Sequence, residues 1–504
     1  ELLARWGEQN TNRALAILAT GGDTAEAEKL LAVQSDYIRR RFDCSDFYLV
    51  YYPYILRTFG KRGSGILSEK TENELTDCLL GFRYWIDEPG NDAMWFWSEN
   101  HALMFHTCQL LAGELFPDEV FTNSGLTGRQ MQAKAKNMLY DWFVTFRKEG
   151  FTEWNSSPYL PIDTLGFGSL YAFAQDPAMR ELGREGMDFA YYLLAVHSQQ
   201  GIFASSSGRT YIKEQFGNWS NCPSGLSWIG YGYGVPGHAG KGITSYCLSD
   251  YEPPKEFAQW FSIPRGKEMI CQTTQGNDGY VDLYTYKTAD YMMTSANDFH
   301  PGEPGHQENP FQLTFNAVAQ LWVTHPGERV LFGAARPSYW AGNGTLPKVN
   351  QYKAFAGLIY DIAPEHPVDF THLYLPSMEF DRCEVEGKWA FVQLGSAYAA
   401  VYCSNGMRMQ DFGSNKDREC IAEGRRCIWL VRAAQADEFA AFEDFKAAMR
   451  GAALDADAEG RRYRFVDPVY GELRCQWGET LYVNDAPMQY SGFDNYGKLT
   501  MQEK

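Results

Sequence analysis

The chain has 504 residues, with 45 Lys and Arg against 63 Asp and Glu, so its formal net charge is −18. This length suits two large domains or about three average ones. The acidic balance argues against nucleic acid and anionic membranes as partners. No stretch approaches the roughly 18 uncharged apolar residues of a membrane helix, which excludes a transmembrane protein. Aromatic residues make up 15% of the chain, an excess typical of clefts that stack on sugar rings and also of large aromatic cores.

The eleven cysteines are odd in number, scattered, and never spaced as CxxC. This pattern argues against a disulfide scaffold and against a thiolate zinc site. Unpaired cysteines favour a reducing compartment, although localisation stays open between a bacterial-type cytoplasm and the periplasm or secretion. The chain begins at Glu1 with no basic stretch followed by an apolar run, so the removal of a leader also stays open.

Residues 1–250 are expected to form helices separated by short breaks. Apolar residues recur at helical spacing, as at Leu139, Phe143 and Phe146, which indicates amphipathic helices with one apolar face. The predicted helices cover roughly 8–19, 24–41, 47–60, 68–86, 99–115, 138–146, 161–175 and 187–195. Because short connections make successive helices pack as antiparallel hairpins, we expect a ring or partial ring of helix pairs.

Beyond a candidate boundary at 251–264, the apolar period changes to two, which predicts strands. The expected strands cover 280–286, 312–323, 328–333, 354–361, 389–394, 397–403, 426–432 and 462–483, with one helix at 437–450. Many strands joined by turns predict an antiparallel β-sandwich over residues 265–504. The fold class is therefore α+β, with a helical domain first. Between the two, residues 200–250 are rich in Gly, Ser, Tyr and Trp, and a loop of this length is usually functional or disordered.

The first candidate cluster precedes and opens a predicted helix. Trp97 and Glu99 lie next to Asn100 and His101. Helix starts receive anions well, so donor and acceptor side chains grouped here indicate a binding or catalytic site. The alternative is structural, with Ser98 acting as an N-cap.

Two further clusters lie in loops of the first half. Glu153 and Trp154 precede Tyr159, whose neighbour Pro158 restricts the backbone, and Trp154 offers a stacking face. The alternative is a connecting loop whose tyrosine packs on the core. Arg209 and Tyr211 follow in a flexible stretch, where Arg209 could bind a carboxylate or sulfate through its fork of donors. An ordinary surface ion pair would explain Arg209 equally well.

The fourth cluster lies in the strand-rich half. His300, His306 and Glu308 share a loop with several prolines and glycines, which restricts the backbone around titratable groups. A structural metal site could use the same residues, but their spacing matches no standard zinc signature. We therefore predict no cofactor and no catalytic metal, and leave a structural metal ion open. Trp340 and Asn343 follow in a segment suited to the rim of a sugar site.

Together, Asn100-His101 at a helix start, Tyr159 in a later loop, and helical hairpins followed by an antiparallel β half resemble the heparinase/chondroitinase/alginate-lyase group of polysaccharide lyases. The resemblance in architecture covers nearly the whole chain, whereas the motif is limited to Asn100-His101 and residues 151–159. The resemblance implies an incomplete α/α toroid at 1–250 joined to a β-sandwich. It also implies cleavage of a uronic-acid-containing poly- or oligosaccharide by β-elimination.

β-Elimination requires three functions, which we assign as hypotheses. Asn100, with Arg209 or a histidine, would neutralise the uronate carboxylate by hydrogen bonding. His101 or Tyr159 would take the C5 proton, and Tyr159 suits the acid that protonates the leaving oxygen. His300 or His306 would reach into the cleft from the β half. The residues expected to bind substrate are Trp97, Glu99, Glu153, Trp154, Tyr211, Glu308, Trp340 and Asn343.

Two other classes of function stay open. A glycoside hydrolase on the same toroid would use paired carboxylates, for which Glu99, Glu153, Asp163 and Glu308 are candidates. A non-catalytic glycan-binding protein would use only the aromatic platforms. The sequence leaves open the sugar, the linkage, endo or exo action and the oligomeric state.

Overall fold

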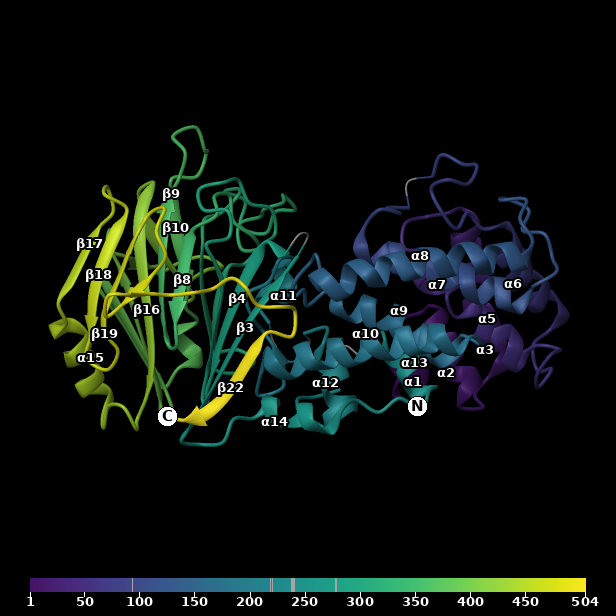
Figure 1. Ribbon diagram of the computed structural model, residues 1–504, viewed down its shortest axis with the longest axis horizontal. Coiled ribbons are helices and arrows are strands. Elements are labelled where there is room, and N and C mark those ends of the chain that lie inside the picture. Colours follow the sequence, from purple (N-terminus) through teal and green to yellow (C-terminus); the bar gives the residue numbers. More distant parts are fainter. Residues whose placement is uncertain (93, 218, 220, 237–240, 277–278) are drawn as a thin grey trace.

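The structure is a computed structural model that describes residues 1–92, 94–217, 219, 221–236, 241–276 and 279–504. Helices occupy the first half of the chain and antiparallel sheets the second, and the two halves lie side by side as two lobes (Figure 1). We call residues 1–261 the helical lobe and residues 267–504 the β lobe. The predicted α+β class, with helical hairpins before an antiparallel sandwich, is confirmed. Division into domains at 250 and 265 stays a prediction.

The helical lobe contains α1 (Leu2–Trp6), α2 (Thr11–Ala19), α3 (Thr24–Arg39), α4 (Asp46–Leu49), α5 (Tyr52–Phe59), α6 (Glu69–Gly81), α7 (Glu99–Leu115), α8 (Gly128–Glu149), α9 (Leu160–Phe173), α10 (Pro177–Val196), β1 (Ser198–Gln199), β2 (Ile202–Phe203), α11 (Ile212–Gln215), α12 (Ser224–Tyr231), α13 (Ile243–Cys247), η1 (Lys255–Phe257) and α14 (Ala258–Phe261).

The β lobe contains β3 (Lys267–Gln275), β4 (Val281–Lys287), β5 (Met292–Asn297), β6 (Phe311–Thr314), β7 (Gln320–Thr324), β8 (Lys348–Tyr352), β9 (Phe355–Asp361), β10 (Phe370–Tyr374), η3 (Ser377–Glu379), β11 (Arg382–Glu386), β12 (Trp389–Leu394), β13 (Ala397–Cys403), β14 (Arg408–Met409), β15 (Glu419–Glu423), β16 (Arg426–Gln435), α15 (Phe442–Gly451), β17 (Leu454–Asp457), β18 (Arg462–Asp467), β19 (Gly471–Gln476), β20 (Tyr482–Val483), β21 (Ala486–Pro487) and β22 (Lys498–Glu503).

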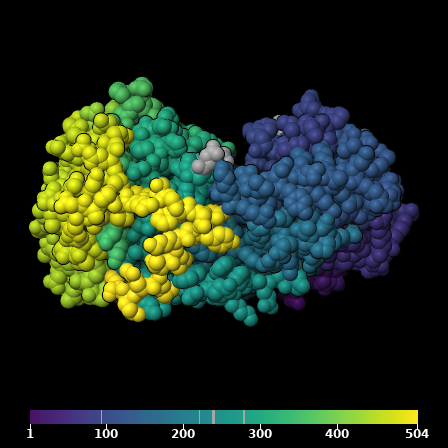
Figure 2. Space-filling model, in the orientation of Figure 1, coloured from purple at the N-terminus to yellow at the C-terminus, as the bar shows by residue number. Residues whose placement is uncertain are grey.

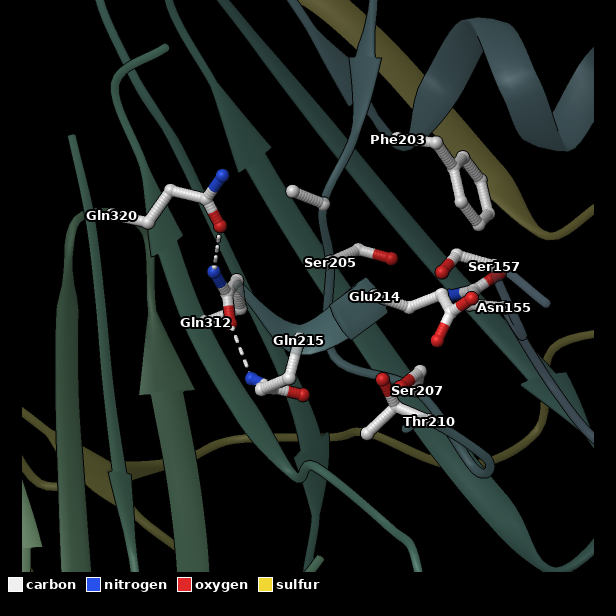
Figure 3. Close-up of a pocket in the computed structure, with 11 residues that line it drawn as sticks. Asn155, Ser157, Phe203, Ser205, Ser207, Thr210, Glu214, Gln215, Gln312 and Gln320 are labelled. Carbon is white, nitrogen blue, oxygen red and sulfur yellow. Dashed lines mark hydrogen bonds between the residues drawn. The ribbon is translucent and has the colours of Figure 1, made fainter. Parts of the chain in front are cut away.

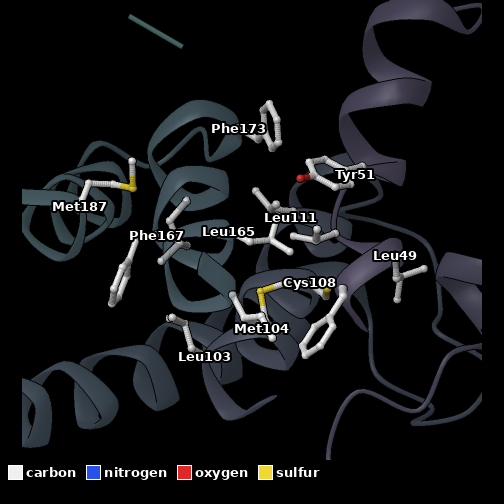
Figure 4. Close-up of a cluster of buried hydrophobic side chains, with 14 of the residues drawn as sticks. Leu49, Tyr51, Leu103, Met104, Cys108, Leu111, Leu165, Phe167, Phe173 and Met187 are labelled. Atoms are coloured by element: carbon white, nitrogen blue, oxygen red, sulfur yellow. The ribbon is translucent and has the colours of Figure 1, made fainter. Parts of the chain in front are cut away.

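Helix pairs build the helical lobe, as the apolar periodicity predicts. Neighbouring helices α2 and α3, α7 and α8, and α9 and α10 pack against each other, which is the hairpin arrangement of an incomplete α/α toroid. Their buried faces share one apolar core, in which Leu103 and Met104 of α7 lie near Leu165 and Phe167 of α9 (Figure 4). The predicted helix at 47–60 divides into α4 and α5, because Pro53 favours the first turn of a new helix.

Two large sheets form the β-sandwich. Strands of the nine-stranded sheet run in the order β14-β15-β10-β7-β6-β5-β4-β3-β22, and those of the six-stranded sheet in the order β11-β12-β13-β16-β9-β8. One apolar core contains Leu313 and Leu321 from the first sheet and Leu358 and Trp429 from the second, so it lies between the two. The strands β17–β21 form a third sheet, and β17–β19 lie with α15 on the side away from the helical lobe (Figure 1).

Three strand predictions need correction. The segment 462–483 divides into the strands β18, β19 and β20. The segment 312–323 forms a hairpin of β6 and β7 rather than one strand. The segment 328–333 forms no strand, and Val330 and Phe332 are 61% and 59% exposed. An apolar run becomes a strand only when another strand supplies hydrogen-bond partners. In this loop, residues 331 and 332 form a turn instead.

The lobes are joined by buried polar contacts as well as by the chain. Lys287 of β4 is completely buried and donates to the carbonyls of Ala195 in α10 and Trp260 in α14, at 3.3 and 2.5 Å. Both carbonyls lie in the last turn of their helix, where a cation is favoured. Asn495 also donates to the carbonyl of Phe146 at 3.3 Å. Among the described residues, no helix combines the length and apolarity needed to cross a membrane.

Close packing of α9 against α10 depends on a glycine. A Cβ at Gly183 would lie 2.6 Å from the carbonyl oxygen of Phe167 and 2.6 Å from the amide of Tyr171. Because both atoms belong to the backbone of α9, neither can shift without distorting that helix. We expect Gly183→Ala to lower the free energy of unfolding by about 1–3 kcal/mol, as measured by denaturant unfolding.

The matched control is Gly451→Ala at the end of α15, where a Cβ would meet no atom within 4 Å. This substitution should change stability by less than about 0.5 kcal/mol. Equal effects of the two substitutions would contradict this account of the α9–α10 contact.

Candidate active site

Three loops that are far apart in the sequence meet where the lobes join. The amide of Gly208 donates to the carbonyl of Trp154 at 2.8 Å, and the amide of Thr210 donates to the carbonyl of Gln307 at 3.1 Å. The segment 207–210 therefore lies between the loop that precedes α9 and the loop that precedes β6. Three of the sequence clusters are brought together in this way. The molecular surface is indented on its upper side, where the lobes meet (Figure 2).

Arg209 is the centre of this cluster. Its Nη1 lies 3.1 Å from Oε1 of Glu153, and its Nη2 lies 3.4 Å from Oη of Tyr159 and 3.3 Å from Oη of Tyr211. The two phenol oxygens are 2.8 Å apart. The guanidinium carbon also lies 5.2 and 5.6 Å from the centres of the two rings, within the range of a cation–π contact. One cation thus organises two hydroxyl groups and one carboxylate.

The environment of Tyr159 keeps its hydroxyl protonated. Burial raises its pKa, the hydrogen bond to Tyr211 raises it further, and Arg209 opposes the rise without cancelling it. A phenol in this state is a proton donor at neutral pH.

His306 is an exposed residue of the β-lobe loop whose Gln307 carbonyl accepts from Thr210. Burial lowers its pKa, Arg209 and Arg336 lower it further, and Glu308 opposes them. His306 is therefore neutral near pH 7 and can accept a proton. Arg336 lies 5.5 Å from the centre of the Tyr211 ring, so a second guanidinium borders the pair of tyrosines.

Three carboxyl groups gather on the helical side. Glu99 of α7 accepts from the amides of Thr152 and Glu153 at 2.9 and 3.3 Å, which fixes the start of α7 against the loop that carries Tyr159. Burial raises the pKa of Glu99 to about 8, although the Thr152 amide opposes it. The pKa of Asp163 in α9 is raised by burial and then by the charges of Glu99 and Glu153. Arg209 is the cation that pairs with Glu153.

Asn100 and His101, although adjacent, have different surroundings. Asn100 is buried in the first turn of α7, where its Oδ1 accepts from Ser98 at 3.1 Å. The ring of His101 is buried, and its Nδ1 lies 2.9 Å from Oδ2 of Asp46. Burial opposes protonation of His101, but the Asp46 charge prevails and the pKa is raised to about 10.

The base role considered for His101 therefore needs correction. Both ring nitrogens face acidic or thiol groups of residues 43–46, with Nε2 3.7 Å from Oδ1 of Asp43. The ring also stacks on Phe47 with 4.8 Å between centroids. We do not assign the C5 base to His101.

Three of the expected substrate-binding residues have structural roles instead. Trp154 is 1% exposed and packs with Phe299 of the β lobe, so it docks the two lobes. Trp340 is fully buried and stacks on His372. Asn343 is also fully buried, and its Nδ2 donates to the carbonyl of Glu308 at 3.1 Å. Because none of them offers a face to a sugar, we correct these assignments.

Other sequence candidates lie at the surface. Trp97 is 64% exposed and lies beside the exposed Trp95, with 5.5 Å between ring centroids. His300 is exposed, and Tyr280 lies next to it at 5.6 Å between centroids. Burial raises the pKa of Tyr280, and the charges of Glu308 and Glu99 add to the rise.

Sequence reasoning missed Tyr280 and Asp46 as site residues. The segment that begins at Arg336 was singled out as the rim of a sugar site, but Trp340 and Asn343 rather than Arg336 were assigned from it. Asp46 lies far from His101 in the sequence, so no local pattern could pair them.

A small polar cavity of about 20 Å³ adjoins the loop before α9 (Figure 3). Asn155, Glu214 and several Ser, Thr and Gln side chains line it. Both polar side-chain atoms of Asn155 and the Oε2 atom of Glu214 have no hydrogen-bond partner among the described residues. A space of this size holds about one water molecule. It is too small for a sugar ring.

Comparison with known proteins gives only remote similarities. No family model matches the chain, and no curated protein matches it. One crystal structure of heparinase III superposes with a TM-score of 0.43 and 9% sequence identity, over 93% of this chain and 81% of that one. A second structure described as heparinase III gives 0.38 and 11%, over 98% and 83%. At these TM-scores neither likeness carries an argument about activity, so the function is argued from the geometry of the site.

Asp163 provides a test of the electrostatics of the site. Because burial raises its pKa, the folded chain keeps this proton at a pH where the unfolded chain has lost it. Stability should then fall as pH rises above the unfolded value of about 4. Asp163→Asn cannot ionise and should show a smaller loss of melting temperature between about pH 5 and pH 8.

Thermal unfolding of both proteins across this range checks the prediction. Parallel curves for the wild type and Asp163→Asn would contradict a raised pKa at this position.

Proposed function

We propose that the protein is a polysaccharide lyase that cleaves a uronic-acid-containing poly- or oligosaccharide by β-elimination. The observation that carries this proposal is the placement of Arg209 against the hydrogen-bonded hydroxyls of Tyr159 and Tyr211, in a segment that contacts the loop of His306 through Gln307. The arrangement combines a carboxylate-binding group, a proton donor and a proton acceptor.

The carboxylate of the uronate must be neutralised before its C5 proton becomes acidic. Arg209 suits this role, because its Nε is buried without a hydrogen-bond partner among the described residues. A guanidinium has five donors and binds carboxylates through two parallel bonds. Arg336 would add a second positive charge, and Asn100 a neutral donor. Such preorganised donors stabilise the charge that develops in the transition state.

We assign the two proton transfers to the groups whose protonation states suit them. His306, with a lowered pKa, takes the C5 proton, and Tyr159, with a raised pKa, donates its proton to the leaving oxygen. Groups whose environments push their pKa values apart are suited to acid and base roles. The C4–O bond breaks as the C4–C5 double bond forms, and no water is consumed.

The carboxyl groups of the helical lobe need not repel a uronate. Glu153 is already paired with Arg209, and the buried Asp163 has a raised pKa. Protonation of a buried carboxyl removes the charge that would oppose an anionic substrate. The exposed Trp97 would provide an aromatic face for a neighbouring sugar ring.

A second candidate function is hydrolysis of a glycoside. It is favoured by the neighbouring carboxyls Glu99 and Glu153, with Glu308 on the β lobe, because inverting and retaining hydrolases both use a carboxyl pair. Hydrolysis consumes water and leaves no double bond. A non-catalytic glycan-binding protein would produce neither product.

The direct test is an ultraviolet assay for unsaturated uronate on a panel of uronate-containing polysaccharides and oligosaccharides, with reducing ends measured in parallel. Tyr159→Phe removes the proton donor and should lower kcat by about 10²- to 10⁴-fold. The matched control is Tyr140→Phe, which removes an exposed hydroxyl on α8 and should leave the rate unchanged.

Release of reducing ends without ultraviolet absorbance would show that the reaction is hydrolysis rather than elimination. Equal rates for Tyr159→Phe and the wild type would remove Tyr159 from the mechanism.

The pH dependence of kcat/KM tests His306 as the base. Activity requires its neutral form, so the acidic limb of the profile should lie below the ordinary histidine value of about 6.5. Arg336 lowers this pKa and Glu308 raises it. Arg336→Met should therefore move the limb to higher pH, and Glu308→Gln should move it to lower pH.

The readout is the position of the limb, which is independent of any loss of substrate affinity. A limb that stays in place in both variants would contradict the assignment of His306.

A further inference from the structure

A second cluster of reactive side chains lies away from Arg209, where the α3–α4 connection meets the first turn of α7. Asp43, Cys44 and His101 each offer one potential ligand atom, and these atoms all lie within 4.8 Å of one another. The Nε2 atom of His101 is 3.7 Å from Oδ1 of Asp43. A nitrogen, a sulfur and an oxygen donor are the three types that zinc accepts in proteins.

The imidazole is oriented by groups behind it. Asp46 is fully buried and lies 2.9 Å from Nδ1 of His101, and its other oxygen has no partner among the described residues. Phe47 stacks on the ring. A buried carboxylate on one ring nitrogen fixes the tautomer and directs the other nitrogen outward, as in the carboxylate–histidine–zinc arrangement.

The other two donors are held by a constrained turn. Cys44 has φ +65°, a left-handed conformation that is uncommon for a residue with a Cβ. Its amide donates to Oδ1 of Asp43 at 2.9 Å, and the hydroxyl of Tyr37 donates to the carbonyl of Asp43 at 2.6 Å. Such strain persists only where the surroundings impose it. Here it places the thiol and the carboxylate on the same side as His101.

We propose that Asp43, Cys44 and His101 bind one zinc ion, with water in the fourth position. A thiolate, a carboxylate and a neutral imidazole carry two negative charges, which balance a divalent cation. The side chain of Asp43 is 52% exposed, so the site is open to solvent, as expected of a zinc site with three protein ligands. This site does not depend on the proposed lyase activity. Local spacing could not reveal it, because His101 is distant from Cys44 in the sequence.

The competing explanation is an ion pair in which a protonated His101 lies between Asp43 and Asp46. Zinc binding and the ion pair differ in the role of Cys44, because a thiolate ligates zinc but is not needed to hold an imidazolium. The decisive variant is therefore Cys44→Ser. Its side chain is only partly buried, whereas His101 is buried and stacked, so the serine variant should fold.

The experiment uses the full chain, stripped with a chelator and then titrated with Zn²⁺, with Co²⁺ as a spectroscopic substitute. We expect one zinc per chain, and a thiolate-to-cobalt charge-transfer band in the wild type. Cys44→Ser should lose the band and the bound zinc. The matched control is Cys247→Ser, which changes an exposed cysteine and should keep both.

Asp46→Asn tests the orienting role without removing a ligand. It should weaken zinc binding by about 10- to 100-fold while keeping the charge-transfer band at saturating cobalt. The proposal is overturned if the wild type binds no zinc after stripping, or if Cys44→Ser binds it as tightly as the wild type. Because no substrate is present, either result leaves the lyase assignment untouched.

Discussion

The guanidinium of Arg209 is the interaction on which the candidate site depends. It contacts the carboxylate of Glu153 and the hydroxyl of Tyr159, both from the loop before α9, and the hydroxyl of Tyr211 in its own segment. Without this cation, Glu153 would lie near Glu99 and Asp163 without its ion-pair partner, which is costly for partly buried carboxylates. The same charge lowers the pKa of His306 and opposes the rise at Tyr159. One side chain therefore sets both the geometry and the protonation states around it.

The two lobes make this arrangement possible by holding loops rather than by contributing their regular elements. Backbone hydrogen bonds attach residues 207–210 to the loop at Trp154 on one side and to Gln307 on the other. Trp154 packs on Phe299, and Lys287 links β4 to the ends of two helices. Loops carry function when a rigid scaffold positions them. Here the scaffold is the docked pair of a helical toroid and a β-sandwich.

Apolar patterning was sufficient to predict most of the fold, although α9 and β13 bury nearly all of their residues rather than one face. The helices α7 and α9 and the strands β9 and β13 appear close to their predicted positions. The loop clusters at Tyr159, Arg209 and His306 were also identified from residue types alone. Burial was not predictable, since nothing local distinguishes the exposed Trp97 from the buried Trp340. The pairing of His101 with Asp46 likewise arises only from the tertiary fold.

The proposed lyase breaks a glycosidic bond by elimination rather than by adding water. The most direct measurement is mass spectrometry of oligosaccharide products formed in water enriched in heavy oxygen. Elimination predicts that neither product carries the label, and that one product is lighter than its hydrolytic counterpart by one water. Heavy oxygen incorporated at the cleaved bond would contradict the account and assign the carboxyl groups, rather than Tyr159 and His306, to the chemistry.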